Sequence, residues 1–218
     1  MVASHRSKVR SPNDSRPKTR DESMKEKTID YLIFSAEKRE ISSFIKTSTK
    51  LNKRAYLKEI HNKTILIIIT GVGKNAVKRT LLNQQSLLHK ITTQKIFNLG
   101  NAGSLKTISS STILNIGKCS GSNGKESITI DTTSHIENIT VNSLQNKKKL
   151  AQQFPNAYSV DMELFHLSKA YPALTAYKII LDTFKINPKS FFFKLLLPIM
   201  IHKNSKLLYA FFIKNYCL

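Results

Sequence analysis

The chain has 218 residues, of which 40% are hydrophobic, so it can bury one substantial core but is too short for two comfortable domains. Lys and Arg number 35 against 14 Asp and Glu, and the formal net charge of +21 raises the question of nucleic-acid binding. The lysines are spread along the whole chain, however, and no helix-turn-helix, zinc-finger or RNA-recognition signature accompanies them. The composition therefore excludes a wholly disordered protein, and it does not favour nucleic acid as a partner.

The two cysteines argue against a metal site or a disulfide framework. Cys119 and Cys217 lie far apart in the sequence, and neither has His or Cys residues around it at metal-ligand spacing. We therefore expect no metal, no disulfide and a cytoplasmic location.

Residues 1–28 differ from the rest of the chain in composition. They are basic and polar, with almost no large apolar residues, which is typical of a disordered tail. This tail lacks the apolar core of a secretory signal, and its acidic residues argue against a transit peptide. We expect residues 29–218 to form a single α/β domain, and the sequence leaves open whether the protein starts at Met1 or Met24.

The first half of this domain alternates short apolar runs with amphipathic segments. The expected order is strand 29–34, helix 37–46, strand 64–69, helix 75–90 and strand 95–99. Strands that alternate with helices are typical of an α/β domain with substantial parallel pairing.

Two glycine-containing turns are expected after these strands. Residues 71–74 read Gly-Val-Gly-Lys, but Ile68 stands where a phosphate-binding loop has its first glycine, and Asn75 replaces the Ser or Thr that would hold magnesium. Residues 100–103 lack the three-glycine spacing of a dinucleotide fingerprint. The sequence therefore predicts no nucleotide cofactor, and the glycines indicate tight turns or close approach of the backbone to a ligand.

Acidic residues next to apolar runs are notable in so basic a chain. Asp161 and Glu163 flank Met162, and Asp161 is a candidate N-cap for a helix from Met162 to about Ala170. Asp182 follows a predicted buried strand over 176–181. An acid at the carboxyl end of such a strand lies where open α/β sheets place their ligand crevice.

The carboxyl-terminal segment 191–218 is rich in Phe, Leu and Ile. Lysines and Pro198 interrupt it before the ~20 apolar residues that a membrane-spanning helix requires. We expect one or two buried helices with basic outer faces and no transmembrane segment, while peripheral membrane contact stays open.

Four segments in order, at 34–41, 70–74, 98–105 and 157–182, resemble the nucleoside phosphorylase/nucleosidase superfamily. They are most similar to the 5′-methylthioadenosine/S-adenosylhomocysteine nucleosidases, and the resemblance covers roughly residues 29 to 185. It implies a three-layer α/β fold in which helices flank a central mixed, largely parallel sheet. It also implies a homodimer or larger homo-oligomer.

The same resemblance implies a role for three of the acidic residues. Glu40 would activate the attacking water, Glu163 would bind the ribose hydroxyls with Met162 packing on the sugar, and Asp182 would protonate the purine. The substrate-binding segment after the predicted strand 95–99 would consist of Asn101, Ala102 and Gly103. Three separated carboxylates suit a glycosidic cleavage, in which one acid protonates the leaving group and a base positions water.

The leading hypothesis is thus a nucleosidase-like hydrolase of purine nucleoside catabolism or methionine salvage, acting on a purine nucleoside or thio-nucleoside without metal or organic cofactor. One alternative is a purine nucleoside phosphorylase, which would need a phosphate site near Gly73 and Lys74. Another is a diverged, inactive binding protein, suggested by Lys118 and Leu181 at positions where the family usually has Asp and a small residue. The short segment between Gly117 and Val141 suggests the same.

Overall fold

The computed structural model describes residues 27–143, 146–182 and 191–218. Residues 1–26 of the predicted tail lie outside this range, whereas Lys27 and Thr28 already belong to the first strand. The strand begins there because Lys27 and Thr28 pair with Ile91 and Thr92.

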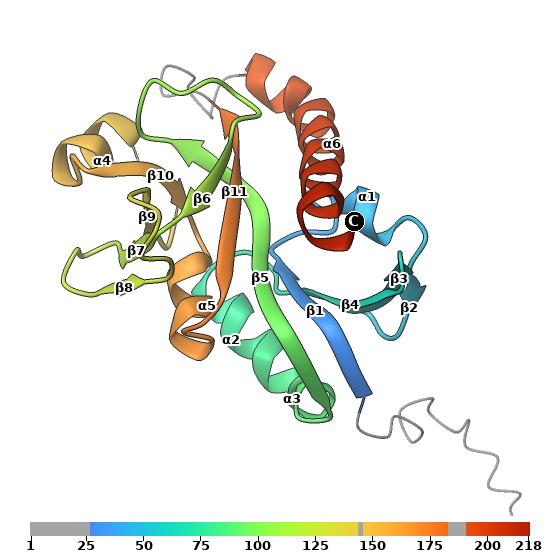
Figure 1. The fold of residues 1–218 in the computed structure, drawn as a ribbon. Coiled ribbons are helices and arrows are strands. Elements are labelled where there is room, and N and C mark those ends of the chain that lie inside the picture. The colour runs from blue at the N-terminus through green and yellow to red at the C-terminus, as the bar shows by residue number, and fades with distance from the viewer. Residues whose placement is uncertain (1–26, 144–145, 183–190) are drawn as a thin grey trace, which may run out of the picture.

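One mixed sheet crosses the molecule (Figure 1). Four parallel strands form its centre, in the order β4 (Lys63–Ile69), β1 (Lys27–Ser35), β5 (Ile91–Ser104) and β11 (Thr175–Asp182). β10 (Ala157–Asp161) joins β5 in antiparallel orientation and pairs on its other side with β9 (Glu137–Thr140). The other described strands are β2 (Thr49–Lys50), β3 (Ala55–Ile60), β6 (Ile113–Ile116), β7 (Lys118–Gly121) and β8 (Ser127–Thr129).

Helices cover both faces of the sheet, which is why the central strands are apolar on both sides. α2 (Lys74–Asn83), α3 (Gln85–Leu88) and α5 (Leu164–Ala170) lie on one face. α1 (Ser42–Ile45) and α6 (Phe191–Phe212) lie on the other (Figure 1). Alternate residues of β4 serve the two cores, because Leu66 and Ile68 pack towards α2 and α5 while Ile65 and Ile67 pack towards α1 and α6. The predicted α/β layers are confirmed.

Two predicted helices differ from the structure. The helix expected over 37–46 is reduced to α1, and residues 38–41 form a turn. The turn forms because the side chain of Glu40 folds back to accept a hydrogen bond from the backbone N–H of Glu37. The helix expected over 75–90 is divided into α2 and α3 at Gln84. The side chain of Gln84 accepts a hydrogen bond from Asn52, in the segment before β3.

The glycine turn expected at residues 100–103 is wrong. β5 continues through this segment to Ser104, because its backbone pairs with β11 from Phe97 to Gly103 and with β10 at its end. The strand therefore carries the predicted substrate-binding residues itself.

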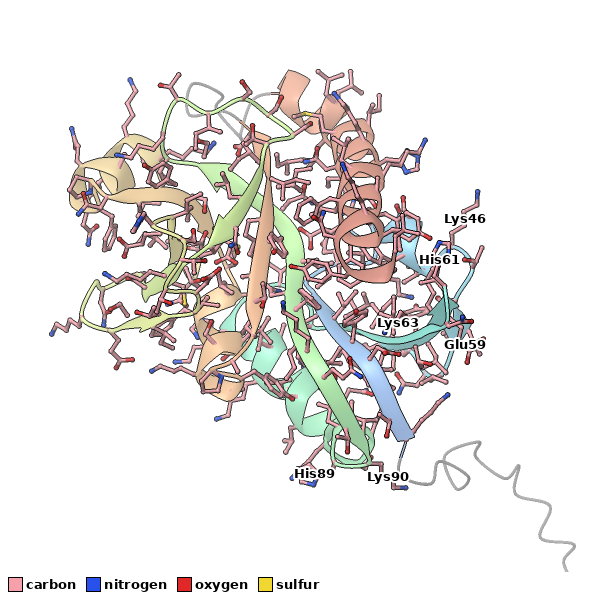
Figure 2. The ribbon with its side chains drawn as sticks, viewed as in Figure 1. Lys46, Glu59, His61, Lys63, His89 and Lys90 are labelled. Carbon is pink, nitrogen blue, oxygen red and sulfur yellow. The ribbon has the colours of Figure 1, made fainter. Side chains whose placement is uncertain are left out.

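The hairpin that joins β3 to β4 has a two-residue turn. His61 and Asn62 both have positive φ, at 46° and 60°, as a two-residue turn of this kind requires. Figure 2 places His61 on the outside of the molecule together with Glu59 and Lys63. This hairpin lies near the β2 edge of the sheet, away from β10 and β11.

The last part of the chain closes the α6 side of the sheet. α6 buries Ile201, Leu208 and Phe212, while His202, Lys203 and Lys206 are exposed, so the predicted basic outer face is present there. Its first half differs, because Leu195, Leu196 and Ile199 are exposed. Among the described residues, no helix is long and apolar enough to cross a membrane.

A π-helical turn follows α6 and returns to the first strand. This turn, η2 (Ile213–Cys217), brings Tyr216 against β1, where its backbone carbonyl accepts a hydrogen bond of 2.6 Å from the Tyr31 hydroxyl. Tyr216 also bonds through its own hydroxyl to Tyr177 of β11. Through Tyr216, η2 is hydrogen-bonded to two central strands, β1 and β11.

Candidate active site

Glu40 lies in the turn after β1 and is held by four hydrogen bonds. Its Oε2 accepts from Ser35 Oγ and from the Glu37 backbone N–H, both at 3.2 Å. Its Oε1 accepts from the backbone N–H and the side-chain amide of Asn101, at 3.1 and 3.2 Å. A Cβ on Gly100 would lie 3.2 Å from Oε2, so this glycine lets the carboxylate approach β5 closely. Two carboxylate oxygens offer about four acceptor sites, and all are used here.

Asn101 connects Glu40 to the carboxyl-terminal helix. Its Oδ1 accepts a hydrogen bond of 2.8 Å from Asn204 of α6. Asn204 is buried and also accepts a hydrogen bond from Ser111. The side chain of Asn101 is thereby oriented with its amide nitrogen towards Glu40.

Glu163 lies at the start of α5 and is buried. Its Oε1 accepts a hydrogen bond of 2.9 Å from the backbone N–H of Gly73, in the turn after β4. Burial, reinforced by the negative charge of Asp161, raises the pKa of Glu163 to about 7. Met162 packs beside it, since its Cε lies 3.9 Å from the position of a Cβ on Gly73. The carboxyl group can therefore change protonation near neutral pH.

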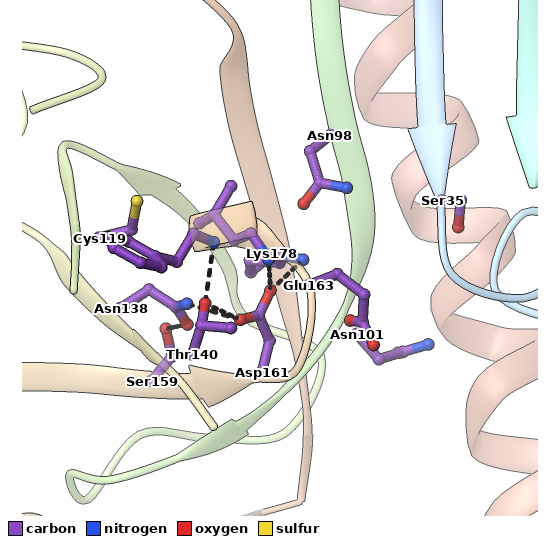
Figure 3. A network of polar contacts seen from close by, with 12 residues as sticks. Ser35, Asn98, Asn101, Cys119, Asn138, Thr140, Ser159, Asp161, Glu163 and Lys178 are labelled. Atoms are coloured by element: carbon purple, nitrogen blue, oxygen red, sulfur yellow. Dashed lines mark hydrogen bonds and ion pairs between the residues drawn. The ribbon is translucent and has the colours of Figure 1, made fainter. Parts of the chain in front are cut away.

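Asp161 and Lys178 form a buried ion pair beside Glu163 (Figure 3). Lys178 Nζ lies 2.6 Å from Asp161 Oδ2, and both side chains are almost fully buried. Asp161 also accepts hydrogen bonds from Asn138, Thr140 and the backbone N–H of Leu164. The last contact satisfies a backbone N–H at the start of α5, but the prediction of Asp161 as N-cap is wrong, because the helix starts at Leu164 and its N-cap is Glu163.

Lys178 keeps its charge despite its complete burial. Burial alone would lower the pKa of this ammonium, but Asp161 and Glu163 outweigh burial and raise the pKa. The charge of Glu40 acts in the same direction on Lys178, and it also contributes to the raised pKa of Glu163. Glu40, Glu163 and the Asp161–Lys178 pair are therefore close enough to interact electrostatically.

Asp182 ends β11 opposite Gly103 of β5. Its Oδ2 lies 2.5 Å from Nζ of Lys147, the first residue of α4 (Lys147–Gln153), and both side chains are about nine-tenths buried. Burial raises the pKa of Asp182, and the Lys147 ammonium opposes this rise. A Cβ on Gly103 would lie 3.1 Å from Asp182 Oδ1 and 3.3 Å from Lys147 Cε, so the glycine makes room for both.

The structure thus brings Glu40 and Asp182 to one stretch of the sheet. Glu40 contacts β5 at Gly100 and Asn101, and Asp182 contacts it at Gly103. Ala102 is buried in the same strand. Glu163, at the start of α5, is bonded instead to Gly73 in the turn after β4, and it interacts with Glu40 electrostatically. Within the described residues, no group of three His, Cys, Asp or Glu could hold a metal ion.

A basic cavity of about 350 Å³ adjoins the Glu40 turn. It is formed by the turn after β1, by the end of β4 with the turn that follows it, and by the residues just before β3. The first two contribute Ala36, Glu37, Gly71 and Val72. Its charged lining includes Lys38, Arg39, Lys53 and Arg54. An excess of cations over the one acid, Glu37, suits an anionic ligand.

Sequence reasoning missed three residues of this region. Lys178 stands inside the apolar run of β11, where a lysine is rare unless it is paired, so it could have been recognised. Lys147 gave no usable signal, because Lys148 and Lys149 follow it and look the same in the sequence. Asn204 lies in a segment remote from the recognised motifs, and only the folded chain brings it to Asn101.

Comparison with solved structures shows that the fold is similar to that of several nucleosidases and of a futalosine hydrolase. A mutant 5′-methylthioadenosine nucleosidase (MTAN) of Helicobacter pylori, with 5′-methylthioadenosine in its active site, matches with a TM-score of 0.67 and 17% identity, over 85% of this chain and 99% of that chain. The futalosine hydrolase of Helicobacter pylori matches with a TM-score of 0.67 and 15% identity, over 85% and 98% of the two chains.

A third similar structure comes from Neisseria meningitidis. It is a 5′-methylthioadenosine/S-adenosylhomocysteine nucleosidase in complex with methylthio-immucillin-A, with a TM-score of 0.64 and 14% identity, over 86% of this chain and 98% of that chain. No protein-family model matches the sequence, and no curated protein matches it significantly. The fold implied by the sequence resemblance is confirmed by these structures.

Proposed function

We propose that this protein is a nucleosidase-like hydrolase that cleaves the N-glycosidic bond of a purine nucleoside or thio-nucleoside. The observation that carries the proposal is the placement of Glu40 and Asp182 against residues 100–103 of β5, with the buried Glu163 close enough to Glu40 for their charges to interact. Similar structures with this fold include a nucleosidase that holds 5′-methylthioadenosine in its active site.

Asp182 is the proposed proton donor to the leaving purine. Cleavage passes through a sugar with oxocarbenium character, and the departing base must receive a proton. The raised pKa of Asp182 favours the protonated carboxyl that this step requires. Once the proton has been transferred, the adjacent Lys147 ammonium stabilises the carboxylate that remains.

Glu163 is the proposed ligand of the ribose hydroxyls, with Met162 against the sugar. An ionised carboxylate can accept both hydroxyl hydrogen bonds and stabilises the positive charge that develops on the sugar. Because its pKa is about 7, we expect ribose binding to strengthen as pH rises through neutrality.

Glu40 is the proposed base for the attacking water. All four of its acceptor sites are used by protein donors, so water must displace one of them. The Asn101 side-chain amide is the donor that a substitution can remove while the backbone N–H groups of Glu37 and Asn101 stay in place. Asn101→Ser should therefore ease water binding at Glu40.

The test is direct incubation of the purified protein with adenosine, inosine and 5′-methylthioadenosine, with and without phosphate. Release of free base in phosphate-free buffer is the expected result, with liberated base measured by chromatography. If no base is released from any nucleoside under either condition, the enzyme proposal is wrong and a binding role takes its place.

The basic cavity beside Glu37 favours a phosphorylase as the second candidate. Its four cationic side chains lie next to Gly71 and Val72, close to the region where phosphate would be needed. Base release that depends on phosphate and yields ribose 1-phosphate would establish this alternative. We favour hydrolysis because Glu40 stands at the position where the nucleosidases that this sequence resembles have the glutamate that activates water.

We also propose that the protein forms a homodimer or a larger homo-oligomer. The exposed Leu195, Leu196 and Ile199 of α6 provide apolar surface that an interface could cover. Light scattering at several protein concentrations would measure the assembly state, and a monomer throughout would contradict it.

A further inference from the structure

Lys147 is placed differently from the two lysines that follow it. Lys148 and Lys149 are exposed on α4, whereas the Lys147 side chain is about nine-tenths buried and meets Asp182 at 2.5 Å. The Asn146 side chain caps α4 by accepting from the backbone N–H groups of Lys148 and Lys149. This cap fixes the first turn of the helix and, with it, the direction in which Lys147 leaves the backbone.

The helix dipole and burial both act against a lysine at this position. Cations in the first turn of a helix are opposed by the helix dipole, and burial of a long ammonium chain carries a desolvation cost. Lys147 shares its helix face with Leu150, which is buried against Ile139 and Ala157. The ammonium is therefore held inside the site rather than in solvent, and its identified partner there is the proposed proton donor.

The purine edge that would face Asp182 carries two groups that can form hydrogen bonds, namely N7 and the substituent at C6. In a 6-oxopurine both N7 and the C6 oxygen accept hydrogen bonds, whereas a 6-aminopurine presents an acceptor at N7 and a donor at C6. An ammonium has only donors, so next to a 6-amino group it would face another donor, and next to a 6-oxo group it finds an acceptor. The Asp182–Lys147 pair offers one proton source for N7 and one cationic donor beside it.

We propose that Lys147 makes this site selective for 6-oxopurine nucleosides, with its ammonium donating to the C6 oxygen while Asp182 serves N7. The inference rests on the proposed nucleosidase function and names its substrate class. Lys147 acts by contact with the base, and its hydrogen bond to Asp182 keeps the two groups side by side. Gly103 provides the space in which both can lie against β5.

The experiment compares substrates that differ at C6. Inosine is paired with adenosine, and 5′-methylthioinosine with 5′-methylthioadenosine, and kcat/KM is measured for the wild-type protein, Lys147→Met and the matched control Lys148→Met. We expect the wild type and Lys148→Met to prefer the 6-oxo member by about 10- to 100-fold. Lys147→Met should lose this preference, chiefly through a fall in kcat/KM for the 6-oxo member.

Binding of the free bases separates this inference from the proposed function. Calorimetric titration with hypoxanthine and adenine should show the same preference, and its loss in Lys147→Met, even where no nucleoside is cleaved. If no nucleoside is cleaved but the base preference is present, the hydrolase proposal is wrong and the role of Lys147 in base selection stands. Equal binding of the two bases, or a preference that survives in Lys147→Met with its circular dichroism spectrum unchanged, would overturn the role of Lys147.

Discussion

Asp161 and Asp182 each meet a lysine inside the protein, but the two carboxylates differ in their surroundings. Asp161 is bonded to Lys178, Asn138, Thr140 and the start of α5, all within the buried network of Figure 3. Asp182 lies at the end of β11, where burial raises its pKa while Lys147 opposes the rise. Asp161 is thus tied into the fold by fixed donors, whereas the burial of Asp182 favours the protonated carboxyl that a proton donor requires.

Lys178→Met tests the structural side of this comparison and has the largest expected effect. The change leaves Asp161 as a buried charge without its cation, which costs about 3–5 kcal/mol of unfolding free energy. Urea unfolding followed by circular dichroism measures the loss. A cost below about 1 kcal/mol would mean that the hydrogen bonds from Asn138 and Thr140 suffice by themselves.

Asp182→Asn tests the functional side. The amide cannot donate a carboxyl proton to the purine, so we expect kcat to fall by about 10²- to 10⁴-fold. Stability should change far less than in Lys178→Met, as the same urea experiment would show. Unchanged turnover would refute the assignment of Asp182 as proton donor.

Glu163 lies between the two regions and adds a pH dependence. Its folded-state pKa of about 7 exceeds the ordinary value of 4.5, so the folded protein binds the proton more tightly than the unfolded chain. This contribution to stability is fully present below about pH 4.5 and is lost as pH rises to about 7. Relative to Glu163→Gln, the wild type should lose on the order of 2 kcal/mol between pH 4.5 and 8.

Unfolding midpoints at a series of pH values would measure this difference. Glu59→Gln, a change at an exposed glutamate of the β3–β4 hairpin, is the matched control and should show no such trend. A constant difference between wild type and Glu163→Gln across the range would contradict the raised pKa.

Lys147→Met has the smallest expected effect on stability. Removal of the cation leaves Asp182 able to take up a proton, so we expect a cost of about 1 kcal/mol at neutral pH. Equilibrium unfolding beside Lys178→Met provides the comparison. Equal losses in the two variants would mean that both pairs are structural.

The sequence predicts the centre of the sheet and not its periphery. Residues 64–69 form a β-branched run that can hardly adopt another structure, and β4 is found there. The short strands β6 to β9 have no comparable run, since their pairing depends on partners that come together only in the fold. The turn at Glu40 was predicted as helix because local propensity carries no information about its contact with Asn101.

The candidate site shows the same division. Glu40, Glu163 and Asp182 could be predicted because each lies within a short sequence segment that resembles a nucleosidase motif. Their roles remain predictions. Lys147 and Asn204 reach the site from helices that the motifs do not include. Residues 144–145, close to Lys147, and the segment after Asp182 lie outside the described part of the chain.

The contact between Tyr31 and Tyr216 has a consequence for biosynthesis. β1 leaves the ribosome early, but the aromatic side chains that cover it, including Phe212 and Tyr216, are made some 180 residues later. At typical elongation rates of about 5–20 residues per second, one face of the nascent sheet stays uncovered for about ten seconds or longer. Chaperone engagement during translation is therefore expected to end only when this last aromatic segment has emerged.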